Sequence, residues 1–316
     1  MTRPAHVPGL HVVVSGASGL IGSEVVADLR RNGHRVRCLV RRPAGPEEIT
    51  WNPASDQLDP AQLEGVDGVI HLAGESIGTR WSRERKIRIR QSRVRGTRLL
   101  SQTLAKLHPP PSVMISASAV GIYGDREDEL LTELSPPGDP ARDFLVSACL
   151  DWEAAADPAR AAGVRVVHPR MGVVLSPKGG ALQKMLLPFR LGAGGRVGSG
   201  RQWMSWIALA DVVGAMRHIL ANESLRGPVN LSAPEPTTNR DFTRILARTL
   251  GRPAVLPVPA VALRAVLGEM ADYTLLSSAR VLPARLIESG YRFEHSHLES
   301  ALRAMLGKQQ RSSFPV

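Results

Sequence analysis

The sequence predicts an α/β protein built on a doubly wound, mostly parallel sheet, followed by a smaller α/β region. Short apolar strands alternate with amphipathic helices from residue 11 to residue 167, the pattern of repeated strand–helix–strand units. A glycine-rich turn joins the first strand to the first helix. Beyond Arg170 the alternation becomes irregular, and a glycine-rich stretch follows at 192–200.

The first strand–helix–strand unit is the clearest part of the pattern. Residues 11–14 are an apolar, β-branched run that is long enough for a buried parallel strand. From Leu20, apolar residues recur with helical spacing up to residue 31, and Gly33 stands where a glycine commonly ends a helix. Residues 35–40 form the second strand. The unit is therefore of the Rossmann type.

The later elements continue the alternation. Strands are predicted at 69–73, 113–116 and 164–167, with helices at 82–106 and 144–162 between them. Further helices are predicted at 208–221, 239–250, 260–267 and 298–306. We expect a Rossmann domain over residues 1–170, with possible return segments near 200–232, and a smaller substrate-side domain over 171–316.

The composition is that of an ordinary folded chain. Hydrophobic residues make up 43% and charged residues 22%, which excludes wholesale disorder, and no stretch approaches the ~20 apolar residues that cross a bilayer. The first ten residues include two prolines and do not resemble a secretory signal. With only Cys38 and Cys149, a disulfide framework and a thiolate zinc site are excluded, so we expect no metal site and a cytoplasmic location.

Basic residues outnumber acidic ones, 40 against 29, which gives a formal net charge of +11. The densest run, 80–98, carries nine basic residues and one acidic residue. On a helix, Ile87, Val94 and the Leu99–Leu100 pair would form a buried stripe and leave the arginines in solvent. Because no nucleic-acid-binding motif accompanies the run, we favour a solvated face over a nucleic-acid footprint. We expect a small-molecule ligand and leave the oligomeric state open.

A nucleotide site is predicted where the first strand turns into the first helix. The motif is Gly16-x-x-Gly19-x-x-Gly22. A pyrophosphate has to approach backbone N–H groups at the positive end of a helix, and a Cβ at these positions would obstruct it. Gly22 also permits close packing of the helix on the strand. Dinucleotide binding is the favoured interpretation, and a purely structural glycine turn is the alternative.

The end of the second strand indicates which dinucleotide is bound. Chains that prefer NAD place an acidic residue here, to bond the ribose 2′-hydroxyl. This chain instead offers Arg41 and Arg42, and no acid occurs before Glu47. Guanidinium groups hold a 2′-phosphate with charge-assisted bonds, so NADP(H) is the expected cofactor. The alternative is a pair of arginines that only end a strand in solvent.

The segments 15–22 (SGASGLIG), 71–74 (HLAG) and 116–120 (SASAV) form one set of motifs. This set resembles the extended short-chain dehydrogenase/reductase superfamily. Further motifs are the segments 71–77 (HLAGESI), 92–94 (SRV), 200–207 (GRQWMSWI), 268–270 (GEM) and 282–286 (LPARL). By these the chain resembles, more narrowly, an atypical epimerase-like family of NAD(P)-dependent epimerase/dehydratases that carries a C-terminal domain of unknown function. The resemblance covers nearly the whole chain. It implies a Rossmann-type N-terminal domain, a small C-terminal substrate region and a nicotinamide cofactor, and it brings no substrate.

The resemblance also implies roles for particular residues. Pyrophosphate contacts fall to the glycine turn, the 2′-phosphate to the arginine pair, and the adenosine-ribose side to the loop after the third strand. Another strand end would lie beneath the nicotinamide, and Arg170 would meet the substrate. The implied cofactor-binding residues are Gly16, Ser18, Gly19, Leu20, Ile21, Gly22, Arg41, Arg42, Leu72, Ala73, Gly74, Glu75, Ser116 and Arg170, while Ser118 is the expected catalytic serine.

The Tyr-x-x-x-Lys pair of this superfamily is absent. In such pairs the ammonium lowers the pKa of the phenol, so that the tyrosine exchanges a proton with the substrate near neutral pH. None of the three tyrosines has a lysine four residues later. Counting back from Glu153 by resemblance, the lysine position is Cys149 and the tyrosine position is Leu145. The asparagine that the superfamily carries on the preceding helix corresponds to Arg93.

Substitutes for the missing pair are few. Tyr123 follows the serine strand and is the candidate proton donor, with a packed loop tyrosine as the alternative. Two functions remain open. The first is an NADP(H)-binding oxidoreductase or epimerase-like enzyme with a rearranged proton donor, acting on an unidentified small molecule. The second is an NADP(H)-responsive binding or regulatory protein with little or no catalysis.

Overall fold

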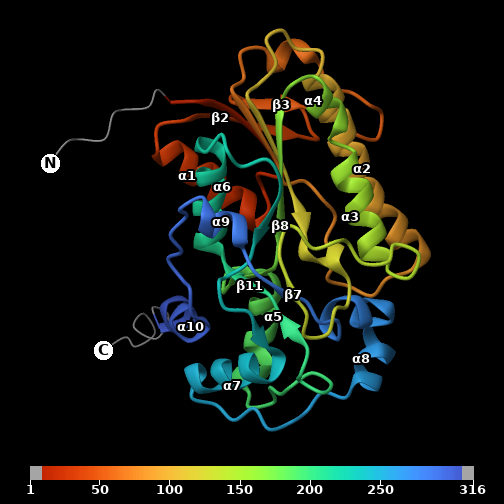
Figure 1. Ribbon diagram of the computed structural model, residues 1–316, viewed down its shortest axis with the longest axis vertical. Coiled ribbons are helices and arrows are strands. Elements are labelled where there is room, and N and C mark those ends of the chain that lie inside the picture. Colours follow the sequence, from red (N-terminus) through yellow and green to blue (C-terminus); the bar gives the residue numbers. More distant parts are fainter. Residues whose placement is uncertain (1–8, 308–316) are drawn as a thin grey trace, which may run out of the picture.

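A computed structural model of the chain describes residues 9–307. Its centre is a parallel sheet in the order β12-β8-β5-β4-β1-β2-β3, and a short strand, β6, also pairs with β8 (Figure 1). These strands are β1 (His11–Ser15), β2 (Arg35–Val40), β3 (Glu48–Thr50), β4 (Gly68–His71), β5 (Val113–Ser116), β6 (Ser118–Ala119), β8 (Arg165–Met171) and β12 (Gly227–Leu231). From β1 the chain adds β2 and β3 on one side and then β4, β5, β8 and β12 on the other, as in doubly wound sheets. The predicted fold class is confirmed.

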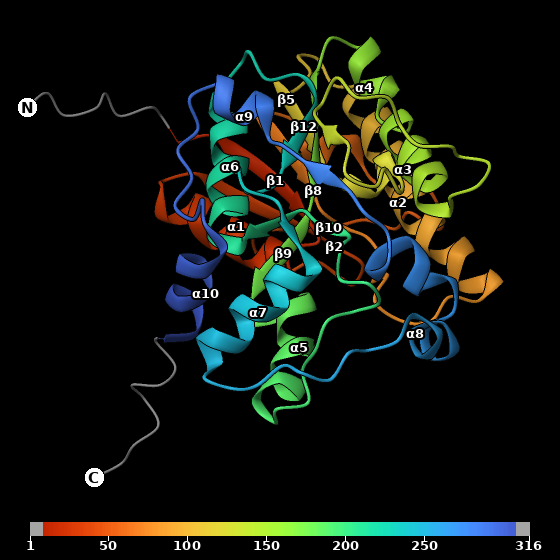
Figure 2. The same ribbon diagram turned by 60° about the horizontal axis from the view of Figure 1, so that its bottom comes forward.

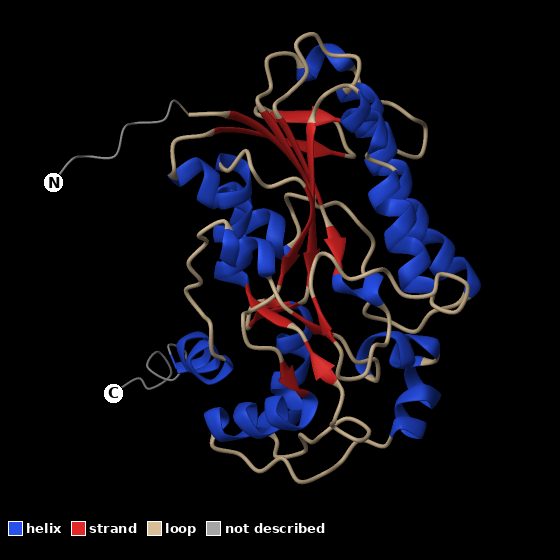
Figure 3. Cartoon of the chain, in the orientation of Figure 1, coloured by secondary structure: helices blue, strands red, loops and turns tan. Residues whose placement is uncertain are grey.

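Helices cover both faces of the sheet (Figure 3). One face carries α1 (Leu20–Arg31) and α6 (Leu209–Ala221), and the other carries α2 (Arg83–Leu104), α3 (Phe144–Ala154) and α4 (Asp157–Ala161). Along β1, Val12 and Val14 pack with α1 and α6, whereas Val13 packs with the apolar residues of α2. This alternation follows from the period of two along a strand, and it places an apolar layer on each face.

The second half of the chain contributes to the sheet as well as to a separate lobe. The strand β12 pairs with β8, and α6 packs against α1, so the segment 209–231 belongs to the sheet. The lobe contains α5 (Gly180–Arg190), α7 (Asn239–Leu250) and α10 (Leu298–Gly307) around buried Trp206 and Phe242 (Figure 2). Small paired strands support it: β9 (Val173–Ser176) with β11 (Trp206–Ala208), and β10 (Trp203–Met204) with β13 (Thr237–Thr238).

The remaining elements are short. They are η1 (Pro60–Leu63), η2 (Val120–Tyr123), β7 (Leu130–Leu131), α8 (Ala260–Leu267), η3 (Ala271–Leu275), β14 (Arg280–Val281) and α9 (Ala284–Glu288). The strands β7 and β14 pair in parallel, which ties the loop after η2 to the C-terminal segment. Within residues 9–307, no helix combines the length and the apolar character needed to cross a membrane.

The structure corrects three details of the predicted elements. The helix expected at 144–162 is two helices, because Pro158 has no N–H and its ring disfavours an unbroken turn before it. Residues 180–190 form a helix, α5, that the sequence analysis did not predict. On α2, Ile87 is 47% exposed, whereas Ile89 is buried, so the buried stripe is shifted from the expected one.

Candidate functional site

The glycine turn between β1 and α1 has the shape of a phosphate cradle. Gly16 has φ +71°, and a Cβ on it would lie 2.8 Å from the backbone nitrogen of Ala73. A Cβ on Gly22 would lie 2.1 Å from the carbonyl oxygen of Gly16. These two glycines are therefore required by the protein's own packing. Leu20 and Ile21 anchor the start of α1 on the apolar core beside the sheet.

Gly19 differs from its two partners. It precedes α1, its φ is −79°, and a Cβ on it would meet only the Gly16 carbonyl oxygen, at 3.3 Å. Ser18 and Gly19 are exposed, no side chain among residues 9–307 caps the helix, and the first turn of the helix contains no acid. The first N–H groups of α1 are therefore left without an intrahelical acceptor, as at the helix ends that bind a pyrophosphate.

A buried hydrogen-bond cluster holds this turn to the loop after β4. The Ser15 hydroxyl oxygen accepts the backbone N–H groups of Leu72 and Ala73, at 3.1 and 3.3 Å. Its own proton therefore goes to His71 Nδ1, at 2.6 Å. Burial lowers the pKa of His71 to about 4, so the imidazole is neutral. Sequence analysis assigned no role to Ser15 or His71.

The cluster makes stability depend on pH. His71 titrates near 6.5 when unfolded and at about 4 when folded, so the unfolded chain binds more protons between these values. Stability should thus rise with pH through this window and be fully present above 6.5, a gain of about 3 kcal/mol from this group. Urea unfolding at pH 4.5 and 7 would measure it. A His71→Asn variant, whose amide oxygen accepts the same bond, should have a flatter profile, and equal slopes would contradict the prediction.

The two arginines after β2 are not equivalent. Arg42 donates to both carboxylate oxygens of Glu48, at 2.8 and 2.7 Å. Arg41 is exposed, and its side chain has no hydrogen-bond or ion-pair partner within residues 9–307. The pair therefore presents one arginine already neutralised by a carboxylate and one available for a ligand.

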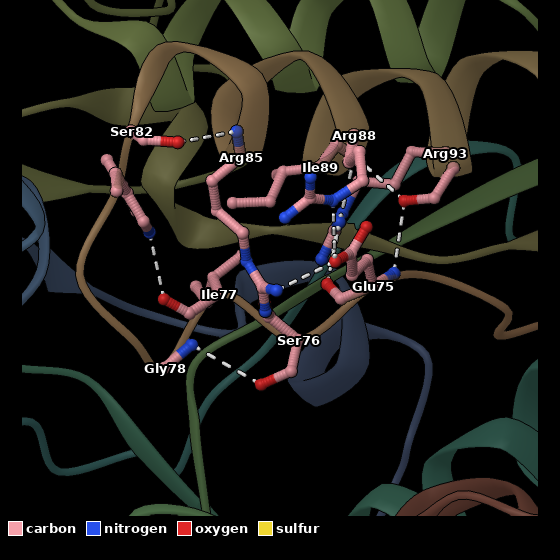
Figure 4. A network of polar contacts seen from close by, with 11 residues as sticks. Glu75, Ser76, Ile77, Gly78, Ser82, Arg85, Arg88, Ile89 and Arg93 are labelled. Carbon is pink, nitrogen blue, oxygen red and sulfur yellow. Dashed lines mark hydrogen bonds and ion pairs between the residues drawn. The ribbon is translucent and has the colours of Figure 1, made fainter.

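The loop after β4 is held by the first half of α2 (Figure 4). The Glu75 carboxylate pairs with Arg85 at 2.9 Å and with Arg88 at 3.4 Å. The Glu75 backbone donates to Ser92 Oγ and accepts from Arg93 Nη1, both at 3.0 Å. Glu75 therefore fixes the loop that carries Leu72, Ala73 and Gly74, and its carboxylate is engaged by the protein.

Other basic side chains of the run 80–98 also have partners inside the protein. Arg80 donates to the carbonyl oxygen of Ala265 near the end of α8, Lys86 pairs with Glu269, and Arg90 pairs with Asp151. These contacts link α2 to the C-terminal segment and to α3. Part of the charge of the run is thus paired inside the protein.

A chain of buried polar contacts lies at the ends of β6, β8 and β12, on the side of β4 away from the glycine turn. Glu153 accepts from Ser118 Oγ at 2.7 Å and from Arg170 Nε and Nη2, both at 2.9 Å. Arg170 Nη1 donates to the Tyr123 hydroxyl at 3.0 Å, and that hydroxyl donates to Asn230 Oδ1 at 2.8 Å. The chain therefore joins α3, β6, β8, η2 and β12.

This arrangement determines where the hydroxyl protons point. The protons of Ser118 and Tyr123 are both given to protein acceptors. Burial raises the pKa of Tyr123, whose side chain is fully buried. Burial opposes the charge of Glu153, but the hydrogen bonds of Arg170 still hold the pKa of Glu153 below its usual value. Tyr123 thus sits inside the protein, and Arg170 is engaged by Glu153 and Tyr123. Ser116 is likewise buried.

The fold and the glycine turn define the class: this is a Rossmann-type protein of the extended short-chain dehydrogenase/reductase kind. The family model described as "NAD dependent epimerase/dehydratase family" matches residues 12–231. The model of a domain of unknown function, DUF1731, matches residues 258–305. The chain belongs to the NAD dependent epimerase/dehydratase family, which confirms the resemblance.

Individual relatives agree with this assignment. The chain is 45% identical to an epimerase family protein of Mycobacterium bovis over 92% of this chain and 96% of the relative. The structure of human epimerase family protein SDR39U1 with NADPH superposes with a TM-score of 0.85 at 34% identity, covering 94% of this chain and 99% of that one. A nucleoside-diphosphate sugar epimerase of Corynebacterium glutamicum gives 0.79 at 38% identity, covering 96% of this chain and 59% of that one.

Proposed function

We propose that this chain binds NADP(H) at the β1–α1 turn and acts as an oxidoreductase or epimerase-like enzyme on an unidentified small molecule. The observation that carries the proposal is the uncapped start of α1 at Gly19 together with Arg41, whose side chain has no partner in the described part of the chain. The similar human protein has been described with NADPH, which supports the same cofactor here. The internal partners of the basic run 80–98 favour a small molecule over a nucleic acid as the ligand.

The residues present fit the two charged parts of this cofactor. The N–H groups at the start of α1, beside Ser18 and Gly19, would hold the pyrophosphate, and Arg41 would hold the 2′-phosphate. Bound NADP(H) supplies hydride transfer, while the protein supplies position and electrostatics. Because Ser118 donates its proton to Glu153, its oxygen accepts a hydrogen bond from a ligand hydroxyl more readily than it donates one.

The test compares the two arginines after β2. Arg41→Ser should weaken NADPH binding about 10-fold or more in calorimetry and leave NADH binding almost unchanged, because only NADPH carries the 2′-phosphate. Arg42→Ser should have a smaller effect, because Glu48 already pairs with Arg42. Failure of the well-folded wild-type protein to take up NADPH would overturn the proposal.

A second candidate function is a nucleotide-responsive binding protein without catalysis. The observation that favours it is the commitment of both candidate hydroxyl protons, those of Ser118 and Tyr123, to protein acceptors. NADPH consumption with a panel of carbonyl compounds and nucleotide sugars separates the two functions. Turnover above that of a Ser118→Ala variant supports the enzyme, whereas tight NADPH binding without turnover supports the binding protein.

A further inference from the structure

The position that carries the lysine in the superfamily holds no cation in this chain. Cys149 stands there on α3, and it is buried. Burial raises the pKa of its thiol to about 12, so the side chain is neutral. The thiol also interacts with the backbone of Ala119, the residue after Ser118. At the end of β6, α3 therefore does not supply the positive charge that the lysine supplies in other members of the superfamily.

A cation reaches the same place from the neighbouring helix. Arg93 on α2 holds its guanidinium carbon 5.0 Å from the centre of the Trp152 ring, three residues after Cys149 on α3. A Cβ on Gly74 would lie 3.4 Å from the same carbon. Arg93 is near enough to Cys149 for its positive charge to act on the pKa of the thiol. The guanidinium thus lies between the loop after β4 and the vacant lysine position.

Part of this guanidinium is not used by the protein. Nη1 donates to the carbonyl oxygens of Glu75 and Ile89, both at 3.0 Å. Nε and Nη2 have no acceptor within residues 9–307, and neither is sealed from solvent. The Glu75 carboxylate is already paired with Arg85 and Arg88, and within residues 9–307 Arg93 forms no ion pair. A guanidinium has only donors, so these N–H groups are available to oxygen acceptors of a ligand that displaces water from them.

We propose that Arg93 supplies the cation of the missing lysine and contacts oxygen atoms of the nicotinamide half of bound NADP(H). This proposal rests on the proposed function. The two ends of the cofactor are then held by different arginines, Arg41 at the adenosine 2′-phosphate and Arg93 at the nicotinamide half. Arg93 is a cofactor-binding residue that belongs to α2, not to the helix that follows the serine strand.

The test uses two ligands that differ in the nicotinamide half. Adenosine 2′,5′-bisphosphate carries the adenosine phosphates alone, and NADPH carries both halves. Arg93→Met should weaken NADPH binding about 10-fold or more in calorimetry and leave binding of the bisphosphate unchanged. Arg93→Lys keeps the charge and should retain most of the NADPH affinity. Arg95→Met, an exposed residue of the same helix, is the matched control and should change neither affinity.

A relocated cation gives a second, independent readout. In the Arg93→Met background, Cys149→Lys should restore NADPH affinity and the emission spectrum of bound NADPH, because it returns a cation to the lysine position. Equal losses for both ligands on Arg93→Met would show that Arg93 only holds the Glu75 loop, and unchanged NADPH affinity would show that it faces another ligand. Either result overturns the proposal. If the wild-type protein binds neither ligand, the proposed function itself fails.

Discussion

Replacing Glu153 with alanine should lower the free energy of unfolding by about 3–5 kcal/mol. Arg170 would lose both carboxylate contacts and remain a buried charge, because the exposed fraction of its side chain is only 7%. A buried charge without a partner costs far more than the pair contributes, since the protein cannot replace the lost hydration. Urea unfolding followed by circular dichroism at pH 7 would measure the loss.

The control for this prediction is an exposed ion pair. Glu299 and Arg303 pair at 2.6 Å on α10 with side chains 41% and 66% exposed. Glu299→Ala should therefore change stability by about 0.5 kcal/mol or less. Adding Arg170→Met to Glu153→Ala should recover part of the loss, because the stranded charge is removed. A cost below about 1 kcal/mol for Glu153→Ala would show that water reaches the Arg170 guanidinium.

The sheet and the glycine turn could be predicted because their signals are local. The apolar run of β1, the glycine spacing and the helical repeat of α1 lie within one short segment, and each specifies backbone shape directly. The helix α5 was missed although Leu182, Leu186 and Phe189 recur with helical spacing. Pro188 inside the helix and glycines at both ends obscured that signal. The stripe of α2 was misplaced because the apolar residues Ile87 and Ile89 both suited a helical face.

The buried chain around Glu153 could not be predicted from local pattern. Tyr123 and Asn230 are 107 residues apart in sequence and meet only because β12 joins the sheet beside β8. Sequence placed Ser118 and Tyr123 near the strand ends, but the direction of their protons depends on those distant partners. By contrast, the pairing of Arg42 with Glu48 spans six residues, and that short spacing was a signal available in the sequence.

The cofactor proposal makes its strongest prediction at Gly19. Gly19→Val should leave the fold intact, because the backbone there is extended and a Cβ would meet only one protein atom, at 3.3 Å. The same side chain would occupy the space in which a pyrophosphate approaches the start of α1. NADPH affinity in calorimetry should therefore fall about 100-fold or more, equivalent to about 3 kcal/mol, with little change in the unfolding midpoint.

Two glycine variants show whether this effect comes from the cradle itself. Gly307→Ala, at the end of α10, should leave NADPH affinity unchanged and alter stability by about 1 kcal/mol or less, because a Cβ there would meet no atom of residues 9–307 within 4 Å. Gly22→Ala should reduce both, because its Cβ would lie 2.1 Å from the Gly16 carbonyl oxygen and push α1 away from the turn. Among Gly19, Gly22 and Gly307, only Gly19 is then a position where a side chain weakens NADPH binding without lowering stability. The space beside Gly19 is needed by the ligand, whereas the space beside Gly22 is filled by the protein's own backbone. A Gly19→Val protein that still binds NADPH with unchanged affinity would place the phosphates elsewhere.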